Sequence, residues 1–304
     1  MTVSDTIIKN GKTPTEKSKS IQNFAYMKKV VYILGAGNSG STLLSMVLGA
    51  HNDIFSVGEL SKIYKFAREN LLCTCGESFS SCEFWNEVVS SIDLESLDIR
   101  PRSRLKEIIL AEYLRTINCH ESPHFFSRNI TLYEKVFSVV KAPVLVDSSK
   151  DLSRFFYLFD NPYFHIVPLY VVRDGRAYID SYLRRGGTSP LKATLKWIRM
   201  NLLTEAILKR LKIDYKQFRI EYESFTKNPA LILNRICQLI GVDYEEEMCA
   251  YYNHVFHNIA GFRGRFDLRP IKTKNKWRDR ISVSSKITFF LLGGHYFNSR
   301  FGIR

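Results

Sequence analysis

The sequence predicts an α/β protein with three layers, in which a central parallel β-sheet lies between two layers of helices. Short apolar runs rich in β-branched residues alternate with longer segments whose apolar residues recur at helical spacing, and this alternation is typical of βαβ units. The chain has 304 residues, of which 45% are hydrophobic and 24% are charged. This composition excludes a fibrous protein and a chain that is disordered throughout.

Four segments have the nearly continuous apolar pattern of buried parallel strands. They are residues 30–34, 144–146, 169–172 and 218–222. Apolar residues at helical spacing predict three helices, over residues 41–50, 191–211 and 229–240. The last of these begins at Pro229 and stops before Gly241, as helix chemistry prefers.

The domain organisation expected from these patterns is a single domain over residues 29–304. Residues 1–28 are polar and lysine-rich and predict a flexible lead-in. Residues 61–131 interrupt the α/β alternation and predict a helical, cysteine-containing insertion. Residues 257–304 form a basic C-terminal segment. No secretory signal or membrane-spanning run is present in the sequence, so we expect a cytoplasmic protein.

The charge of the chain indicates a polyanionic partner. Its formal net charge is +14, and residues 261–304 contribute eleven Lys and Arg against Asp267 and Asp279. A nucleotide with several phosphates, a nucleic acid, an anionic surface or a merely solvated basic face would each fit this bias. The segment has no recognisable nucleic-acid-binding module, so we do not expect a nucleic-acid partner.

Three cysteines gather within the expected insertion, at Cys73, Cys75 and Cys82. A tetrahedral zinc site takes four ligands, and no histidine or fourth cysteine lies within twenty residues of this group. The sequence therefore favours packing thiols in a reducing compartment, with a local disulfide and a zinc site as the alternatives. We expect no metal.

The glycine-rich segment after the first strand admits several interpretations. Gly35-x-Gly37-x-x-Gly40 matches the dinucleotide-binding fingerprint, and Glu59 lies 19 residues beyond it, where an acid that binds ribose would be sought. A nucleoside-triphosphatase loop is poorly supported, because Ser41 follows Gly40 where that loop has lysine. A turn that only packs a helix on a strand is the alternative without function.

Five blocks of the chain, taken in order, resemble those of the sulfotransferases that use 3′-phosphoadenosine 5′-phosphosulfate (PAPS). Residues 37–44 with 57–59 resemble the family's 5′-phosphosulfate loop, and residues 169–181 resemble its 3′-phosphate motif. The remaining blocks resemble its lysine-bearing loop, its Tyr-Glu strand end and its basic closing segment; they are residues 146–150, 219–225 and 257–277. The dinucleotide fingerprint explains the first block alone.

This resemblance implies the P-loop nucleotide-binding-like sulfotransferase fold and transfer of sulfonate to a hydroxyl by in-line displacement. Within the family, the resemblance is to the tyrosylprotein and carbohydrate sulfotransferases. Glu59 aligns with the residue that serves as catalytic base in the tyrosylprotein branch. Lys150 aligns with the lysine that steadies the leaving phosphate. The residues implied to bind PAPS are Gly37, Asn38, Ser39, Gly40, Ser41, Thr42, Arg173, Ser181, Arg185, Tyr222, Arg263 and Arg265, with Lys274 and Lys276 as further candidates.

The chain departs from the family at Asn38, where many members have arginine, so a charge-assisted contact to the donor is lost. A non-catalytic nucleotide-binding homologue and an NAD-binding oxidoreductase are therefore the competing functions. The cysteine pattern resembles an insertion of many bacterial members. The acceptor expected is a hydroxyl of a sugar, lipid, peptide or small molecule, and the oligomeric state stays open. The apolar run at 287–292 predicts a terminal packing helix, with peripheral membrane contact as the alternative.

Overall fold

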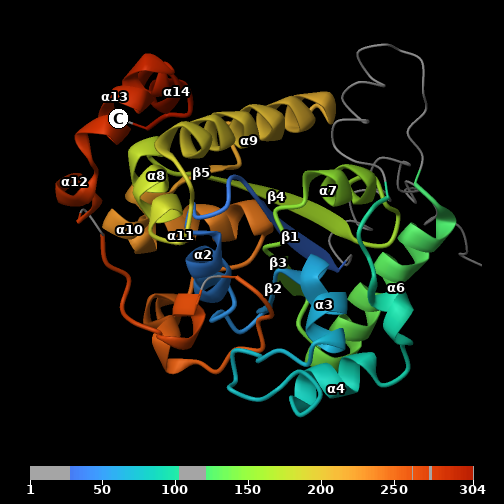
Figure 1. Ribbon diagram of the computed structural model, residues 1–304. Helices are drawn as coiled ribbons and strands as arrows, with labels where there is room; N and C mark the ends of the chain where they lie inside the picture. The colour runs from blue at the N-terminus through green and yellow to red at the C-terminus, as the bar shows by residue number, and fades with distance from the viewer. Residues whose placement is uncertain (1–27, 103–120, 262, 274–275, 304) are drawn as a thin grey trace, which may run out of the picture.

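The computed structural model describes residues 28–102, 121–261, 263–273 and 276–303, and its centre is a parallel sheet of five strands (Figure 1). The strand order is β2-β3-β1-β4-β5. The strands span Lys29–Leu34 (β1), Ile54–Gly58 (β2), Val144–Asp147 (β3), His165–Val172 (β4) and Arg219–Glu221 (β5).

Helices connect these strands and extend the chain at its C-terminal end. The α-helices are α2 (Ser41–Leu48), α3 (Ile63–Arg68), α4 (Glu83–Val89), α6 (Pro123–Val140), α7 (Leu152–Leu158), α8 (Gly175–Leu183), α9 (Pro190–Arg210), α10 (Tyr222–Lys227), α11 (Pro229–Ile240), α12 (Trp277–Arg280), α13 (Val283–Leu291) and α14 (Gly294–Arg300). Short 3-10 helices are η1 (Leu60–Lys62), η2 (Leu94–Leu97), η3 (Glu246–Asn253) and η4 (Arg263–Phe266).

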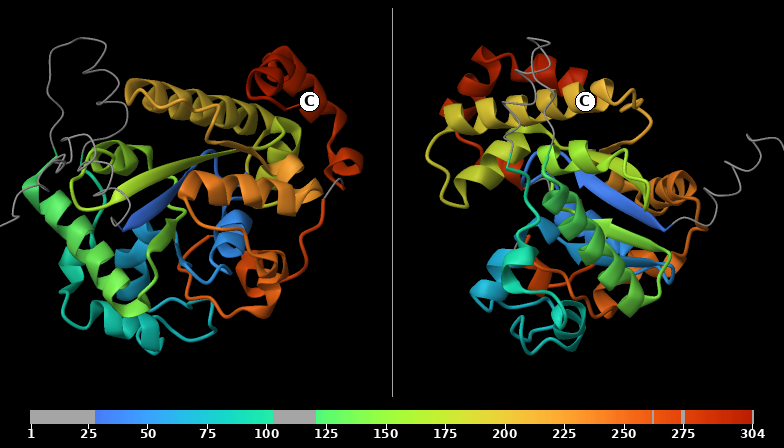
Figure 2. Two further views of the ribbon diagram at one scale, coloured as in Figure 1. Left: turned by 180° about the vertical axis from the view of Figure 1, so that it is seen from behind. Right: turned by 90° about the vertical axis from the view of Figure 1, so that its right-hand side faces the viewer.

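Alternate residues of β1 enter two separate hydrophobic layers, because successive side chains of a strand point to opposite faces. Val30 and Tyr32 pack in the layer covered by α6, α7 and α9, whereas Val31 and Ile33 pack in the layer covered by α2 and α11. Figure 1 and Figure 2 show α9 along one face of the sheet and α2 with α11 along the other. The predicted three-layer α/β/α architecture is therefore confirmed.

The predicted elements agree with the structure apart from three differences in the strands. β5 covers Arg219–Glu221 rather than the predicted 218–222, because Tyr222 begins α10, which was not predicted. β2 was not predicted, because its sequence Ile-Phe-Ser-Val-Gly is short and holds a polar residue at its centre. β4 begins at His165, four residues before the predicted start. The prediction started too late because Pro168 lies within the strand. Proline cannot donate to a ladder and therefore argues against a central strand when a sequence is read alone. Residues 1–27 lie outside the described residues.

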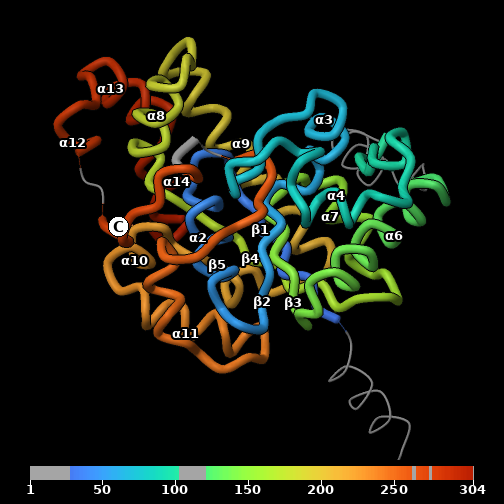
Figure 3. Tube along the Cα trace, turned by 90° about the horizontal axis from the view of Figure 1, so that it is seen from below, coloured from blue at the N-terminus to red at the C-terminus, as the bar shows by residue number. Residues whose placement is uncertain are grey.

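The helices of the predicted insertion and the C-terminal helices lie toward opposite edges of the sheet. In Figure 3, α3, α4 and α6 gather on one side, and α12 and α13 lie beside α8 on the other. α13 packs through Phe289, whose ring lies 5.8 Å from that of Trp197, while Phe290 and Leu291 are exposed. None of the helices in the described ranges has both the length and the apolar character needed to cross a bilayer.

The strand order defines where a ligand would bind. β1 and β4 are neighbours, but the chain leaves β1 toward β2 at one edge and leaves β4 toward β5 at the other. In open α/β sheets, a crevice forms at the carboxyl ends of two strands whose connections diverge in this way. The order also differs from that of dinucleotide-binding folds, where β2 adjoins β1. Here β3 separates them, so Glu59 does not follow the strand beside the glycine-rich turn.

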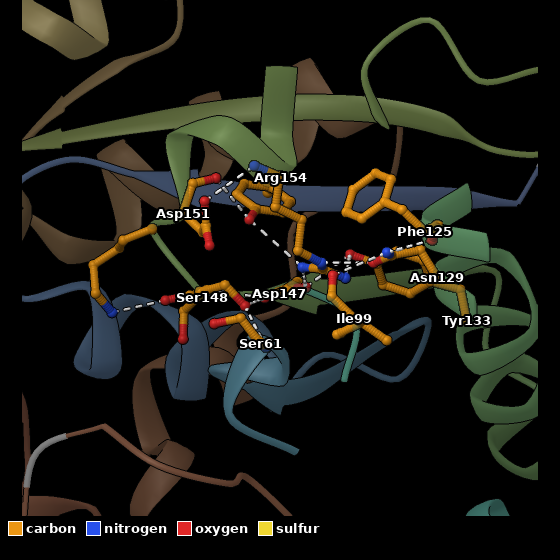
Figure 4. A network of polar contacts seen from close by, with 12 residues as sticks. Ser61, Ile99, Phe125, Asn129, Tyr133, Asp147, Ser148, Asp151 and Arg154 are labelled. Carbon is orange, nitrogen blue, oxygen red and sulfur yellow. Dashed lines mark hydrogen bonds and ion pairs between the residues drawn. The ribbon is translucent and has the colours of Figure 1, made fainter. Parts of the chain in front are cut away.

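A buried ion pair organises the carboxyl end of β3 (Figure 4). Asp147 and Arg154 are both fully buried, and Arg154 Nη1 donates to Asp147 Oδ2 over 2.6 Å. The Tyr133 hydroxyl donates to the same carboxylate oxygen over 2.7 Å. Arg154 Nε donates to the side-chain oxygen of Asn129 over 2.7 Å. Each charge therefore has a counter-charge and further hydrogen bonds, which a buried pair requires.

The other oxygen of Asp147 fixes the loop that follows β3. Asp147 Oδ1 accepts hydrogen bonds from the backbone N–H of Ser149, over 2.9 Å, and from the Ser149 hydroxyl. The Ser149 hydroxyl in turn accepts from the N–H of Ser61 over 2.9 Å. Lys150 comes next in the chain, with a left-handed φ of 59°. The ion pair thus determines where Lys150 leaves the sheet.

Replacement of Asp147 by asparagine would leave the Arg154 guanidinium buried without its counter-charge. Because removing one partner of a buried ion pair costs about 3–5 kcal/mol, we expect Asp147→Asn to lower the free energy of unfolding in urea by that amount. The control is Asp267→Asn, since Asp267 pairs with Arg269 where both side chains are mostly exposed. Equal stability of the two variants would contradict this account of the ion pair.

Candidate functional site

The turn between β1 and α2 lies at the carboxyl end of β1, the strand that neighbours β4 in the sheet. Asn38 and Gly40 both have left-handed φ angles, of 66° and 94°. Gly40 is the N-cap of α2, and no side chain caps the helix there. The first N–H groups of a helix have no partner within it and attract anions. This geometry suits a phosphate or sulfonate group.

A buried hydroxyl beside this helix start also points to a ligand. Ser39 is 1% exposed, and its Oγ has no hydrogen-bond partner within the described part of the chain. Buried polar groups normally find partners, so an orphaned hydroxyl in a glycine-rich turn indicates a missing acceptor or donor. Ser41 is also buried, at the first position of α2. The predicted cradle of residues 37–42 is therefore one continuous turn and helix start.

Tyr222 closes the cradle from the side of β5. A Cβ placed at Gly40 would lie 2.2 Å from the Tyr222 ring, so only glycine fits there. The Arg173 guanidinium lies over the ring of the same tyrosine, with its Cζ 4.6 Å from the Tyr222 ring centroid. Burial raises the pKa of Tyr222, with Arg173 acting in the opposite direction. Gly40, Tyr222 and Arg173 thus pack as one unit.

Two arginines converge on Asn38. Arg173 Nη1 donates to the Asn38 carbonyl over 2.8 Å, and Arg185 Nη1 donates to the side-chain oxygen of the same residue. Arg173 follows β4, while Arg185 follows the end of α8. Burial and the nearby Arg173 and Arg184 lower the pKa of Arg185. Two neighbouring positive charges at one turn would favour a bound anion.

Ser181 belongs to the helix between these two arginines. It lies on α8, two residues before the helix ends, and is 2% exposed. Asp174 caps the start of α8 by accepting from the N–H of Arg176 over 2.8 Å. α8 therefore connects the two arginines, with Arg173 just before its start and Arg185 just after its end.

Glu59 and Lys150, the two predicted catalytic residues, form an ion pair. Lys150 Nζ donates to Glu59 Oε1 over 2.7 Å and to the carbonyl of Ser148 over 2.7 Å. The side chains are only 18% and 13% exposed. Glu59 follows β2, and Lys150 lies in the loop after β3. Both residues follow the carboxyl ends of parallel strands, at the same end of the sheet as the glycine-rich turn.

A backbone strap from Phe256 to Gly261 joins Glu59 to the helix start. The N–H of Glu59 donates to the Ile259 carbonyl over 2.9 Å, and the N–H of Ile259 donates to the Val57 carbonyl over 3.2 Å. A Cβ at Gly261 would lie 3.1 Å from Thr42 Oγ1. The strap therefore contacts both the predicted base and the predicted phosphate cradle.

The basic segment beyond this strap is only partly placed. Arg263 begins η4, and Lys274 lies outside the described residues. Arg265 stacks on Phe266, with Cζ 4.2 Å from the ring centroid, and Nη2 donates to the Leu72 carbonyl over 3.4 Å. Burial lowers the pKa of Arg265. Lys276 is exposed and directly precedes α12.

The three cysteines of the insertion meet a histidine from the strap. One ligand atom each from Cys73, Cys75, Cys82 and His257 lies within 4.8 Å of the others. Burial raises the pKa of the Cys73 thiol and of the Cys82 thiol, so neither is an activated nucleophile. The sequence search for a fourth ligand near the cysteines missed His257, because 175 residues separate it from Cys82.

Sequence reasoning also gave no role to Glu223, which shares a block with Tyr222. Its Oε1 accepts from the N–H of Asp174 over 3.2 Å, while Oε2 has no partner among the residues that the structure describes. Burial raises the pKa of this carboxyl group. Glu223 supports the loop that carries Arg173, and its place beside Tyr222 was the available signal.

Comparisons with known proteins agree with this geometry. The family model described as "Sulfotransferase family" matches residues 31–246, and no curated protein matched the sequence. The sulfotransferase domain from the Synechococcus PCC 7002 olefin synthase has a TM-score of 0.54 at 18% identity, over 88% of this chain and 95% of that domain. The sulfotransferase domain from the curacin biosynthetic pathway has a TM-score of 0.53 at 20% identity, over 88% of this chain and 98% of that domain. At such identities, the likeness concerns the fold.

The close contact between Gly40 and Tyr222 leads to a stability prediction. Alanine at position 40 would have both a left-handed φ and a Cβ overlapping the aromatic ring, so we expect Gly40→Ala to destabilise the protein by more than about 1 kcal/mol. Gly37→Ala is the matched control in the same turn, because a Cβ there meets no atom within 4 Å. Thermal unfolding of the two variants makes the comparison, and a greater loss in Gly37→Ala would refute the packing argument.

Proposed function

We propose that this chain, which belongs to the sulfotransferase family, transfers a sulfonyl group from PAPS to an acceptor hydroxyl and releases adenosine 3′,5′-bisphosphate. The observation that carries the proposal is the placement of the Glu59–Lys150 pair. It lies at the same sheet edge as the glycine-rich turn, whose buried Ser39 hydroxyl has no partner in the described ranges. A base, a cation and an anion cradle thus share one edge.

The residues of the cradle fit the two ends of the donor. The helix start at Gly40 and the Ser39 hydroxyl supply donors for the 5′-phosphosulfate. Arg173 and Arg185 supply cations for the 3′-phosphate, with Ser181 on the helix between them. The Arg173 Nε is buried and unpartnered within the described part of the chain, so this guanidinium retains donor capacity for a phosphate.

The contact between Arg185 and Asn38 bears on the absence of an arginine at position 38. Where many family members have an arginine in the turn, this chain has an amide whose oxygen accepts from Arg185. The guanidinium therefore reaches the turn from the end of α8 rather than from the turn itself. We propose that Arg185 restores the missing positive charge, so that Asn38 is compatible with catalysis.

In the proposed reaction, Glu59 accepts the proton of the acceptor hydroxyl as that oxygen bonds to sulfur. The bond between sulfur and the bridging oxygen breaks in line, and Lys150 stabilises the charge that develops on that oxygen. In this step the Lys150 ammonium group would exchange its contact with Glu59, at 2.7 Å, for a contact with the leaving phosphate. The donated proton then replaces the lysine as the partner of Glu59.

The class of acceptor is left at a hydroxyl-bearing sugar, lipid, peptide or small molecule, and the tyrosylprotein branch remains one option through Glu59. We propose the cytoplasm as the location and no metal in the reaction. NAD-dependent oxidation is the competing function from the sequence. It loses its main support because β3 lies between β1 and β2, which removes Glu59 from the position of a ribose-binding acid.

Donor binding is tested by thermal unfolding with adenosine 3′,5′-bisphosphate, ATP or NAD. A ligand that binds only the native state stabilises it by about 2.7 kcal/mol at 100 times its dissociation constant. We expect the bisphosphate to produce such a shift and Arg173→Ala to abolish it, while Arg199→Ala, which removes an exposed arginine of α9, leaves it unchanged. Stabilisation by NAD alone, or by none of the three, would overturn the proposal.

The role of Glu59 is tested by the release of adenosine 3′,5′-bisphosphate from PAPS in the presence of a panel of sugars, phenols and peptides. Loss of a general base lowers rates by about 10²–10⁴-fold, so we expect Glu59→Gln to lose turnover on that scale and to keep the thermal shift with the bisphosphate. Glu69→Gln, at a surface ion pair, is the control. Donor binding without turnover in the unmodified chain would instead identify a non-catalytic homologue.

A further inference from the structure

A cluster of four metal-ligand side chains lies beside the site but outside the machinery described above. This Cys3His cluster consists of Cys73, Cys75, Cys82 and His257. We propose that it binds one zinc ion as a structural site, which fixes the strap at residues 256–261 against the cysteine-bearing insertion. The metal has no part in the transfer reaction.

The positions of the ligand atoms fit a tetrahedral ion. Zinc bonds sulfur at about 2.3 Å, so the sulfur atoms of a tetrahedral site are about 3.8 Å apart. All four ligand atoms of the cluster are within 4.8 Å of one another, and Cys82 Sγ is 3.2 Å from His257 Nδ1. Side-chain adjustments of about 1 Å would therefore complete the coordination sphere.

The backbone around the first two cysteines presents both thiols on one turn. Leu72 and Ser78 pair as an antiparallel bridge, and the N–H of Cys73 donates to the Glu77 carbonyl over 2.9 Å. Gly76 then turns the chain with a left-handed φ of 97°, and its N–H donates to the Cys73 carbonyl over 3.1 Å. One residue separates the two cysteines, fewer than the two to four that are typical of structural zinc sites, and the turn at Gly76 still leaves both thiols beside Cys82 and His257.

The strap is held in place so that its histidine faces the thiols. Trp85 Nε1 donates to the His257 carbonyl over 2.7 Å. Thr74 Oγ1 accepts from the N–H of Asn258 over 2.6 Å and donates to the Phe256 carbonyl over 2.7 Å. These contacts make the histidine a fixed fourth ligand.

The chemistry of the ligands favours zinc over a disulfide. Three sulfurs and one imidazole make a closed, soft ligand set, which selects tetrahedral zinc. The three thiols are free in the structure, and one disulfide among them would leave the third cysteine and His257 without a shared role. Binding of zinc would release the thiol protons to solvent and leave three thiolates on the ion.

A zinc ion here would stabilise the surroundings of the predicted base. The strap that supplies His257 also accepts from the N–H of Glu59 through Ile259, and it contacts Thr42 through Gly261. Its other end therefore touches the sheet edge where transfer is proposed. This consequence rests on the proposed function, whereas metal binding itself does not.

Metal content of the purified full-length chain tests the site directly. We expect elemental analysis of protein from zinc-supplemented medium to find about one zinc per chain. Cys82→Ser and His257→Ala should each lower zinc content at least about tenfold, because each removes one of the four metal ligands. His257→Cys should restore the zinc content by supplying a fourth thiolate. Cys237→Ser is the control, since Cys237 is buried under the opposite face of the sheet and should keep its zinc.

A second measurement covers the case in which these variants fail to fold. The unmodified chain is stripped with a chelator and reloaded with Co²⁺, whose visible spectrum distinguishes tetrahedral thiolate ligation from other geometries. Zinc-free protein as isolated, a disulfide between any two of the cysteines by mass spectrometry, or zinc retained in Cys82→Ser would each overturn the proposal. Zinc content is independent of sulfonyl transfer, so failure of the proposed activity would leave this result interpretable.

Discussion

The buried ion pair of Asp147 and Arg154 is the interaction on which the geometry of the candidate site depends. It joins β3 to α7, and through Tyr133 and Asn129 it also joins both to α6. Such a pair adds little net stability compared with apolar packing, but breaking it leaves an uncompensated charge. Its value here is positional, because the second carboxylate oxygen fixes Ser149 and hence the path of the chain into Lys150. Without this network, the loop after β3 would lose the contacts that hold Lys150 beside Glu59.

Backbone contacts over long distances in the sequence complete what the ion pair begins. The strap at residues 256–261 extends the edge of β2 through Ile259 and reaches the insertion through Thr74 and Trp85. The predicted base is thus held by its own strand, by the loop after β3 and by a segment almost 200 residues later. Because these supports come from separate parts of the chain, Glu59 is positioned only when the whole domain is folded. Thr74 and Trp85, which lie in the predicted insertion, therefore help to hold the strap beside Glu59.

The sequence predicts those features whose physical cause is local. Buried strands of β-branched residues, the Pro229 start and Gly241 end of α11, and the glycine-rich turn before α2 all follow from neighbouring residues. Glu59, Lys150 and the donor residues came from matched motifs rather than from patterning, and their roles are still predictions. β2 escaped notice because Ser56 breaks its apolar run, and its burial depends on packing beside β3. His257 escaped because nothing near it in the sequence shows that the fold returns it to the cysteines.

The arginines at the turn favour an anion before any donor arrives. Arg185 lies near Arg173 and Arg184, and burial together with these like charges lowers its pKa. Its contact at the turn is the neutral amide of Asn38, which accepts a hydrogen bond but cannot offset charge. A phosphate at this corner would reverse the unfavourable electrostatics, because an opposite charge within a few ångströms favours the cation. An arginine at position 38 would add a third cation to the same corner, whereas the asparagine accepts a hydrogen bond from Arg185 without adding charge.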